Sequence, residues 1–145
     1  MATDIQIDPR GPRFGAAWTL LLAVLAMVIG ANSVGLVLAF ALAALFLPGA
    51  IVGPQATVQS AAFKKWVRPR LAPPGETESF RPPRFAQQVG LFFATLAIVF
   101  LALNLAVGFY IAIGFVLVAS FLNAVFDFCL GCEVYLLVTR ATRRA

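Results

Sequence analysis

The chain has 145 residues, of which 61% are hydrophobic and only 12% charged, with a mean hydropathy of +0.93 and a formal net charge of +5. A soluble domain is closer to half apolar and a quarter charged, so this composition excludes an ordinary soluble domain and indicates a membrane protein. The sequence contains no histidine, which excludes His-based acid–base catalysis and His-ligated metal or haem.

Four apolar segments predict four membrane-spanning helices. They cover about residues 14–30, 34–51, 86–107 and 108–138, and no charged residue occurs in them before Asp127. The cluster Gly30-Ala31-Asn32-Ser33 predicts a turn between the first two segments. The last two segments together are far too long to cross a membrane once, so we predict a tight turn near Val107-Gly108.

These spans predict an all-α integral membrane protein, a four-transmembrane-helix bundle built from two parallel helical hairpins. The 22 residues from Arg10 align without gaps on the 22 residues from Arg81, and ten positions are identical, including a shared R-x-P-R-F. Internal duplication explains this match; the alternative is convergent membrane-boundary chemistry, with Arg at the headgroups and Pro in the first turn. The predicted parts are an N-terminal arm (1–13), a first hairpin (14–52), a basic Pro-rich loop (53–84), a second hairpin carrying Cys-x-x-Cys (85–138) and a basic tail (139–145).

The basic residues predict the orientation of the chain. All eleven lie in the arm, the loop or the tail, and the two short turns have none. Because Lys and Arg concentrate on the cytoplasmic side of membrane proteins, both termini and the loop are predicted to be cytoplasmic. The eleven residues are Arg10, Arg13, Lys64, Lys65, Arg68, Arg70, Arg81, Arg84, Arg140, Arg143 and Arg144.

The loop is predicted to lie at the membrane surface. Its stretch FKKWVRPRL places one tryptophan among four cations, which is typical of a segment at the headgroups of anionic lipids. No stacking platform or recognition helix accompanies this charge, so nucleic acid is not an expected partner. The candidate lipid- or partner-contacting residues are Lys64, Lys65, Trp66, Arg68, Arg70, Arg81 and Arg84.

Cys129 and Cys132 are the only cysteines and the candidate catalytic pair. A helix from Gly108 would reach them after about 30 Å, at the cytoplasmic boundary, and their spacing would put both on one face of a continuing helix. The flanking carboxylates Asp127 and Glu133 are candidate modulators of the thiol pKa values. Three interpretations remain open: a dithiol that cycles with a disulfide, half of a metal site completed by a dimer or by Asp127, and buried cysteines without chemistry.

The leading functional hypothesis is a membrane-anchored thiol–disulfide or sulfur-relay partner, with no cofactor and no metal of its own. The rival is a structural or assembly subunit of a membrane complex, in which the cysteines are inert. A small transporter ranks third, with Asn32, Asn104 and Asn123 as polar contacts for a substrate.

Four stretches carry a family resemblance: PRGPRF, VRPRL, PPRFAQQVG and LNAVFDFCLGCEVYLL, between about Asp8 and Leu137. Together they resemble domain of unknown function 4395, a family of bacterial membrane proteins, and the most specific block is C-L-G-C-E-x-Y at residues 129–135. Where that family leads us to expect a glycine shortly before the first cysteine, this chain has Asp127-Phe128. The resemblance implies a bacterial cytoplasmic membrane and a thioredoxin-like or sulfurtransferase protein as partner.

Overall fold

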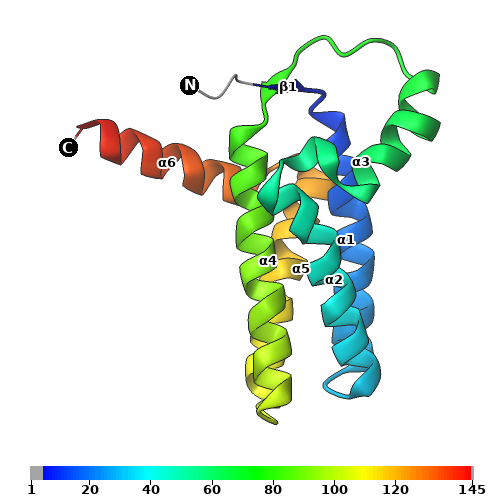
Figure 1. Cartoon of the computed structure of the whole chain (residues 1–145), viewed down its shortest axis with the longest axis vertical. Helices are drawn as coiled ribbons and strands as arrows, with labels where there is room; N and C mark the ends of the chain where they lie inside the picture. The colour runs from blue at the N-terminus through cyan, green and yellow to red at the C-terminus, as the bar shows by residue number, and fades with distance from the viewer. Residues whose placement is uncertain (1–4, 145) are drawn as a thin grey trace.

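Four long helices form a bundle in the computed structural model, which describes residues 5–144 (Figure 1). They are α1 (Arg10–Ile29), α2 (Ser33–Ile51), α4 (Arg81–Ala102) and α5 (Ala106–Phe126). Each has 19 to 22 residues and is long and apolar enough to cross a membrane. The predicted all-α fold with four candidate membrane spans is therefore confirmed.

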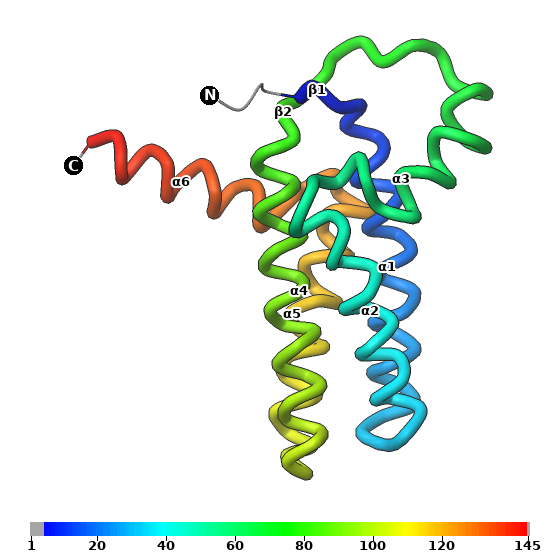
Figure 2. The backbone as a smooth tube through the Cα atoms, viewed as in Figure 1, coloured from blue at the N-terminus to red at the C-terminus, as the bar shows by residue number. Residues whose placement is uncertain are grey.

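The shorter elements gather at one end of the bundle, where the described chain begins and from which its last helix runs outward (Figure 2). Residues 1–4 of the predicted arm and residue 145 of the predicted tail lie outside the described part. The first half of the predicted loop, residues 54–70, is helical. The elements at this end are β1 (Gln6–Ile7), η1 (Pro54–Ala56), α3 (Val58–Ala62), η2 (Phe63–Val67), η3 (Arg68–Arg70), β2 (Glu78–Ser79) and α6 (Leu130–Arg144).

Small residues let the long helices approach one another closely. Helix α1 packs mainly against α5, and α2 mainly against α4. The core contains fully buried Leu42, Phe109 and Ile113 among many buried alanines, as is common where helices associate in lipid. Large apolar side chains cover the outside of the bundle, where a soluble protein would be polar. Examples are Leu21, Val28, Val37, Phe40, Phe92, Val99, Ile111, Phe115 and Val118.

The turn between α1 and α2 lies where the sequence predicts it. Gly30 has φ +92°, a conformation that L side chains rarely adopt, and the Asn32 side chain accepts hydrogen bonds from the N–H groups of Val34 and Gly35. Asn32 is thus the N-cap of α2, which satisfies N–H groups that have no partner within the helix.

The turn between α4 and α5 comes earlier than predicted. The chain reverses at residues 103–105, with Asn104 at φ 58°, rather than near Val107-Gly108. Asparagine tolerates this left-handed conformation better than most residues. Gly108 lies inside the first turn of α5, where an added Cβ would meet the Phe100 ring at 2.5 Å. That glycine serves close helix packing and not the turn.

The prediction that the fourth span continues to Val138 is wrong. Helix α5 ends at Phe126, because Asp127 adopts a left-handed conformation (φ 55°, ψ 31°). The N–H of Asp127 donates a hydrogen bond to the Leu122 carbonyl. The apolar residues beyond Asp127 belong to α6, which leaves the bundle sideways, roughly across its long axis (Figure 1). An apolar run alone does not show where a backbone changes direction.

Two arginines close the ends of two long helices. Arg13 of α1 donates from Nε to the Ala124 carbonyl (3.1 Å) and from Nη2 to the Val125 carbonyl (3.3 Å) at the end of α5. Arg84 of α4 donates from Nε to the Ala50 carbonyl (3.3 Å) at the end of α2. The last carbonyls of a helix lack partners and form the negative end of its dipole, so a cation there is favourable.

A two-stranded antiparallel ribbon joins the beginnings of α1 and α4. Strand β1 pairs with β2, with Gln6 opposite Ser79 and Ile7 opposite Glu78. Matching turns lead from the strands into the helices: the Arg10 N–H donates to Asp8 Oδ1 (3.0 Å), and the Arg81 N–H donates to Ser79 Oγ (3.3 Å). The ribbon therefore holds the two helices together where they begin.

We expect Arg84→Ala to lower the free energy of unfolding by about 1–2 kcal/mol, because it removes a charged hydrogen bond to a helix end. Arg13→Ala should have a smaller effect in the same direction, since Arg13 is more exposed to water. Thermal unfolding in detergent micelles measures both. Arg70→Ala, at an exposed loop position, is the matched control. An Arg84→Ala protein as stable as the Arg70→Ala protein would contradict the capping role.

Candidate functional site

The two cysteines lie at the junction between α5 and α6. Cys129 and Cys132 are joined by a disulfide, with their Cα atoms 5.2 Å apart, and both residues are partly buried. The junction is at the end of the bundle that also holds the ribbon and the basic loop (Figure 1). The disulfide thus sits where a membrane-spanning helix gives way to a helix outside the bundle.

The backbone places Cys129 at the N-terminus of α6. Its carbonyl accepts a hydrogen bond from the Glu133 N–H (3.1 Å), and its Sγ accepts one from the Cys132 N–H (3.2 Å). The side chain of Cys129 therefore acts as the N-cap, a position that Ser, Thr, Asp or Asn usually takes. The left-handed Asp127 makes this possible by turning the chain between the helices, and its position is close to where the family resemblance leads us to expect a glycine.

Gly131 and Tyr135 dock the first turns of α6 onto α4. A Cβ added to Gly131 would lie 2.7 Å from both Cα and Cβ of Ala86, so only glycine permits this approach. One turn further along, the Tyr135 and Phe85 rings lie 5.7 Å apart between centroids. Sequence reasoning missed this docking, because Gly131 and Ala86 are far apart in the sequence and only the fold brings them together.

The acidic residues near the disulfide are exposed. Neither Asp127 nor Glu133 makes a side-chain hydrogen bond or salt bridge within residues 5–144, so their roles as pKa modulators remain predictions. Partial loss of water around its carboxyl raises the pKa of Glu78, and the negative charge of Asp127 raises it further, although part of the Glu78 side chain stays exposed. The charge of Asp127 therefore acts on Glu78 of the ribbon.

The predicted surface residues divide into two groups. Lys64, Lys65, Trp66, Arg68 and Arg70 are exposed on the segment η2–η3, and the Lys65 ammonium lies 5.3 Å from the Trp66 ring centroid. Arg81 is exposed at the start of α4.

Arg84 does not belong to this exposed set. It is partly buried and bound to the Ala50 carbonyl, where Gln88 Nε2 also donates (3.1 Å). Arg84 thus caps a helix end, and its contact with lipid or a partner stays a prediction.

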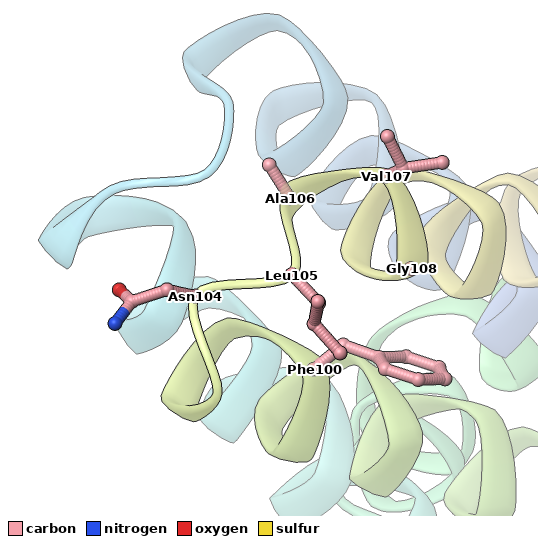
Figure 3. Close-up of a pocket in the computed structure, with 6 residues that line it drawn as sticks. All are labelled: Phe100, Asn104, Leu105, Ala106, Val107 and Gly108. Atoms are coloured by element: carbon pink, nitrogen blue, oxygen red, sulfur yellow. The ribbon is translucent and has the colours of Figure 1, made fainter.

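The opposite end of the bundle holds a shallow apolar hollow at the turn between α4 and α5 (Figure 3). The Leu105 side chain points toward the Phe100 ring, whereas the Asn104 amide points away from it. This hollow carries no charged side chain, so it offers no chemistry comparable to the disulfide. Its lining residues are Phe100, Asn104, Leu105, Ala106, Val107 and Gly108.

The structure gives two of the predicted transporter contacts structural roles, since Asn32 caps α2 and Asn104 forms a left-handed turn. Within the described residues, no group of three or more His, Cys, Asp or Glu side chains is placed to hold a metal ion. The disulfide is therefore the chemically distinctive feature of the described chain.

Replacing Gly131 with Val should displace α6 from α4, because the new side chain would overlap the backbone of Ala86. Hydrogen–deuterium exchange should then be faster at the amides of α6, while the four long helices keep their protection. Gly75→Val is the matched control, because a Cβ at Gly75 would meet nothing within 4 Å. Unchanged exchange in the Gly131→Val protein would show that α6 does not depend on this contact.

Comparison with known proteins identifies one family. Residues 7–140 match the family described as Domain of unknown function (DUF4395). No curated protein and no solved structure matches the chain. The family match runs from β1 into α6, so it covers nearly the whole chain and includes both cysteines. The chain therefore belongs to the DUF4395 family.

Proposed function

We propose that this protein is a membrane-anchored thiol–disulfide or sulfur relay that acts through Cys129 and Cys132. The observation that carries the proposal is the hydrogen bond from the Cys132 N–H to Cys129 Sγ at the N-terminus of α6. In the reduced protein the same N–H and the positive end of the α6 dipole favour a thiolate at Cys129. Cys129 is then the attacking sulfur, and Cys132 resolves the mixed disulfide.

The exchange reaction is balanced without a cofactor. A thiolate of a partner dithiol attacks Cys129 Sγ, the Cys129–Cys132 bond breaks, and Cys132 leaves as a thiolate that takes up a proton. The second thiolate of the partner then attacks the partner sulfur that is bonded to Cys129. This step forms the disulfide of the partner and releases Cys129 as a thiolate. The partner loses two electrons and this chain gains them.

The sulfur-transfer variant uses the same pair. The Cys129 thiolate takes the outer sulfur from a persulfide on a partner, and the partner leaves as a thiolate. The Cys132 thiolate then attacks the inner sulfur of the Cys129 persulfide, which releases hydrosulfide and forms the disulfide. A thioredoxin-like protein suits the first reaction and a sulfurtransferase suits the second.

We further propose that the bundle consists of two duplicated parallel hairpins. Arg13 and Arg84 hold equivalent places in the repeated R-x-P-R-F, and each caps the second long helix of the other half. Ile7 and Glu78, which stand opposite one another in the ribbon, are separated by the same 71 residues as Arg10 and Arg81. Pairing of equivalent residues across an antiparallel ribbon is what a two-fold axis between the halves requires.

The duplication extends to the segments that follow the second helix of each half. Thr57 is the N-cap of α3, and its Oγ1 accepts a hydrogen bond from the Ser60 N–H at 3.0 Å. In the other half Cys129 Sγ accepts from the Cys132 N–H in the same way. The neighbouring aromatic contacts also correspond, since Phe14 and Phe63 pair at 5.8 Å as Phe85 and Tyr135 pair at 5.7 Å.

This correspondence argues against inert cysteines. The Thr57 hydroxyl, which accepts from the Ser60 backbone N–H, caps the equivalent helix start without any sulfur. Capping and packing therefore do not require cysteine at this position, whereas disulfide exchange does. The thiol relay accounts for the cysteines in a way that a purely structural or assembly role does not.

The proposed location is a bacterial cytoplasmic membrane, with both termini on the cytoplasmic side. All charged residues that the structure describes lie toward the end of the bundle with the ribbon and α6, and the two far turns carry none. The positive-inside rule assigns that end to the cytoplasm. The exposed cations at Lys64, Lys65, Arg68 and Arg70 would guide an acidic partner toward the disulfide.

The chain supplies its own matched variant for the test, Cys129→Thr with Cys132→Ser, which copies the pair Thr57 and Ser60. We expect this double variant to unfold at the same temperature as the reduced wild type and to lose all dithiol–disulfide exchange. Exchange is measured in sealed inside-out vesicles with a membrane-impermeant maleimide, after equilibration with a dithiol–disulfide buffer.

Wild-type chains should take up two maleimides together after reduction and none before it. With Cys132→Ser, the remaining Cys129 should react faster near neutral pH than Cys132 does in the Cys129→Ser protein. Two outcomes would contradict the relay: cysteines that stay reduced in every buffer, or a Thr/Ser variant much less stable than the reduced wild type. The second outcome would assign the pair to a structural role.

A further inference from the structure

Helix α6 has an apolar stripe that no part of the described chain covers. None of its residues is buried, and it contacts the bundle mainly where its first turns dock onto α4. The members of the stripe repeat at the spacing of one helix face. They are Leu130, Val134, Leu137, Val138 and Ala141, and the first four are exposed by 41% to 62%.

Apart from the exposed Leu136, the other face of the helix is polar and carries one acid, Glu133, beside three arginines. Thr139, Arg140, Arg143 and Arg144 lie away from the centre of the apolar stripe, and the three arginines are exposed. An amphipathic helix with cations on its polar face is typical of segments that lie in the plane of a membrane. The combination distinguishes α6 from the four long helices, which are apolar on most sides.

The position of α6 relative to the bundle limits what covers the stripe. It branches off directly after α5 ends and runs roughly across the bundle axis (Figures 1 and 2). It docks at Phe85 and Ala86, in the second turn of α4. When the four long helices cross a bilayer, a helix branching at this level and in this direction lies at the boundary between headgroups and hydrocarbon.

We infer that α6 is an in-plane membrane helix whose apolar stripe enters an anionic bilayer surface, with its arginines at the lipid headgroups. The partner is the lipid surface itself, because the stripe supplies apolar contact and the three arginines supply the matching positive charge. The disulfide at the beginning of α6 is then held at the edge of the membrane, within reach of water.

The test compares two positions about two and a half turns apart, which face opposite sides of the helix: Val134 and Arg143. Each is replaced by cysteine in the full-length Cys129→Thr, Cys132→Ser protein, labelled with a nitroxide, and placed in vesicles of phosphatidylcholine with or without phosphatidylglycerol. Electron paramagnetic resonance then measures access of dissolved oxygen, which concentrates in lipid, and of a water-soluble nickel chelate.

In vesicles that contain phosphatidylglycerol, we expect the Val134→Cys label to favour oxygen over nickel several-fold and the Arg143→Cys label to show the reverse. Arg140→Gln, Arg143→Gln and Arg144→Gln together should reduce the oxygen preference at position 134, and so should removal of the anionic lipid. Equal access of the nickel chelate to both labels would overturn the inference. Dipolar broadening at position 134 would also overturn it, because the stripe would then face a second copy of the chain.

The disulfide-intact protein provides a second measurement. With Cys129 and Cys132 oxidised, only the introduced cysteine of Val134→Cys can react with the label. The same oxygen preference in this protein supports the in-plane position of α6 with the native pair present. Loss of the oxygen preference in the oxidised protein would show that α6 lies in the membrane plane only when Cys129 and Cys132 are replaced. That result would overturn the inference.

Discussion

The ends of apolar helices must be closed, and in this protein two arginines do so from neighbouring helices. The last carbonyls of α2 and α5 lie where an apolar span meets the charged end of the bundle. Arg84 and Arg13 reach across from the beginnings of α4 and α1 to satisfy these carbonyls. The same contacts set which helices are neighbours, since α1 packs mainly against α5 and α2 mainly against α4.

Hydropathy predicted the four long helices because lipid requires long apolar segments with internal hydrogen bonds. The asparagine and glycine at the first turn were also readable, since both residues favour left-handed or capping conformations. The prediction of a continuous fourth span was wrong at Asp127. The apolar stripe of the amphipathic helix α6 begins soon after this residue, so the hydropathy shows no break there. Local sequence alone does not show that this aspartate adopts a left-handed conformation.

The cysteine pair was found from sequence, but its geometry was not. A continuing helix would have placed both sulfurs on its side, one turn apart, without a special role for either. The structure instead makes Cys129 the cap of a new helix and Cys132 the donor of the N–H that the cap accepts. This asymmetry arises only because the chain turns at Asp127 and because Gly131 lets α6 approach α4. The signal for it was the glycine between the cysteines, whose close approach to Ala86 cannot be read from one sequence.

The pairing of each helix with a helix from the other half has a consequence for how the protein is made. The first hairpin is synthesised before the residues that complete it, because the main partners of α1 and α2 are α5 and α4. Until the second hairpin inserts, the end of α2 lacks the guanidinium of Arg84, and Arg13 has no helix end to close. Before α4 and α5 are made, α1 and α2 can therefore pack only against each other and lack their main partners.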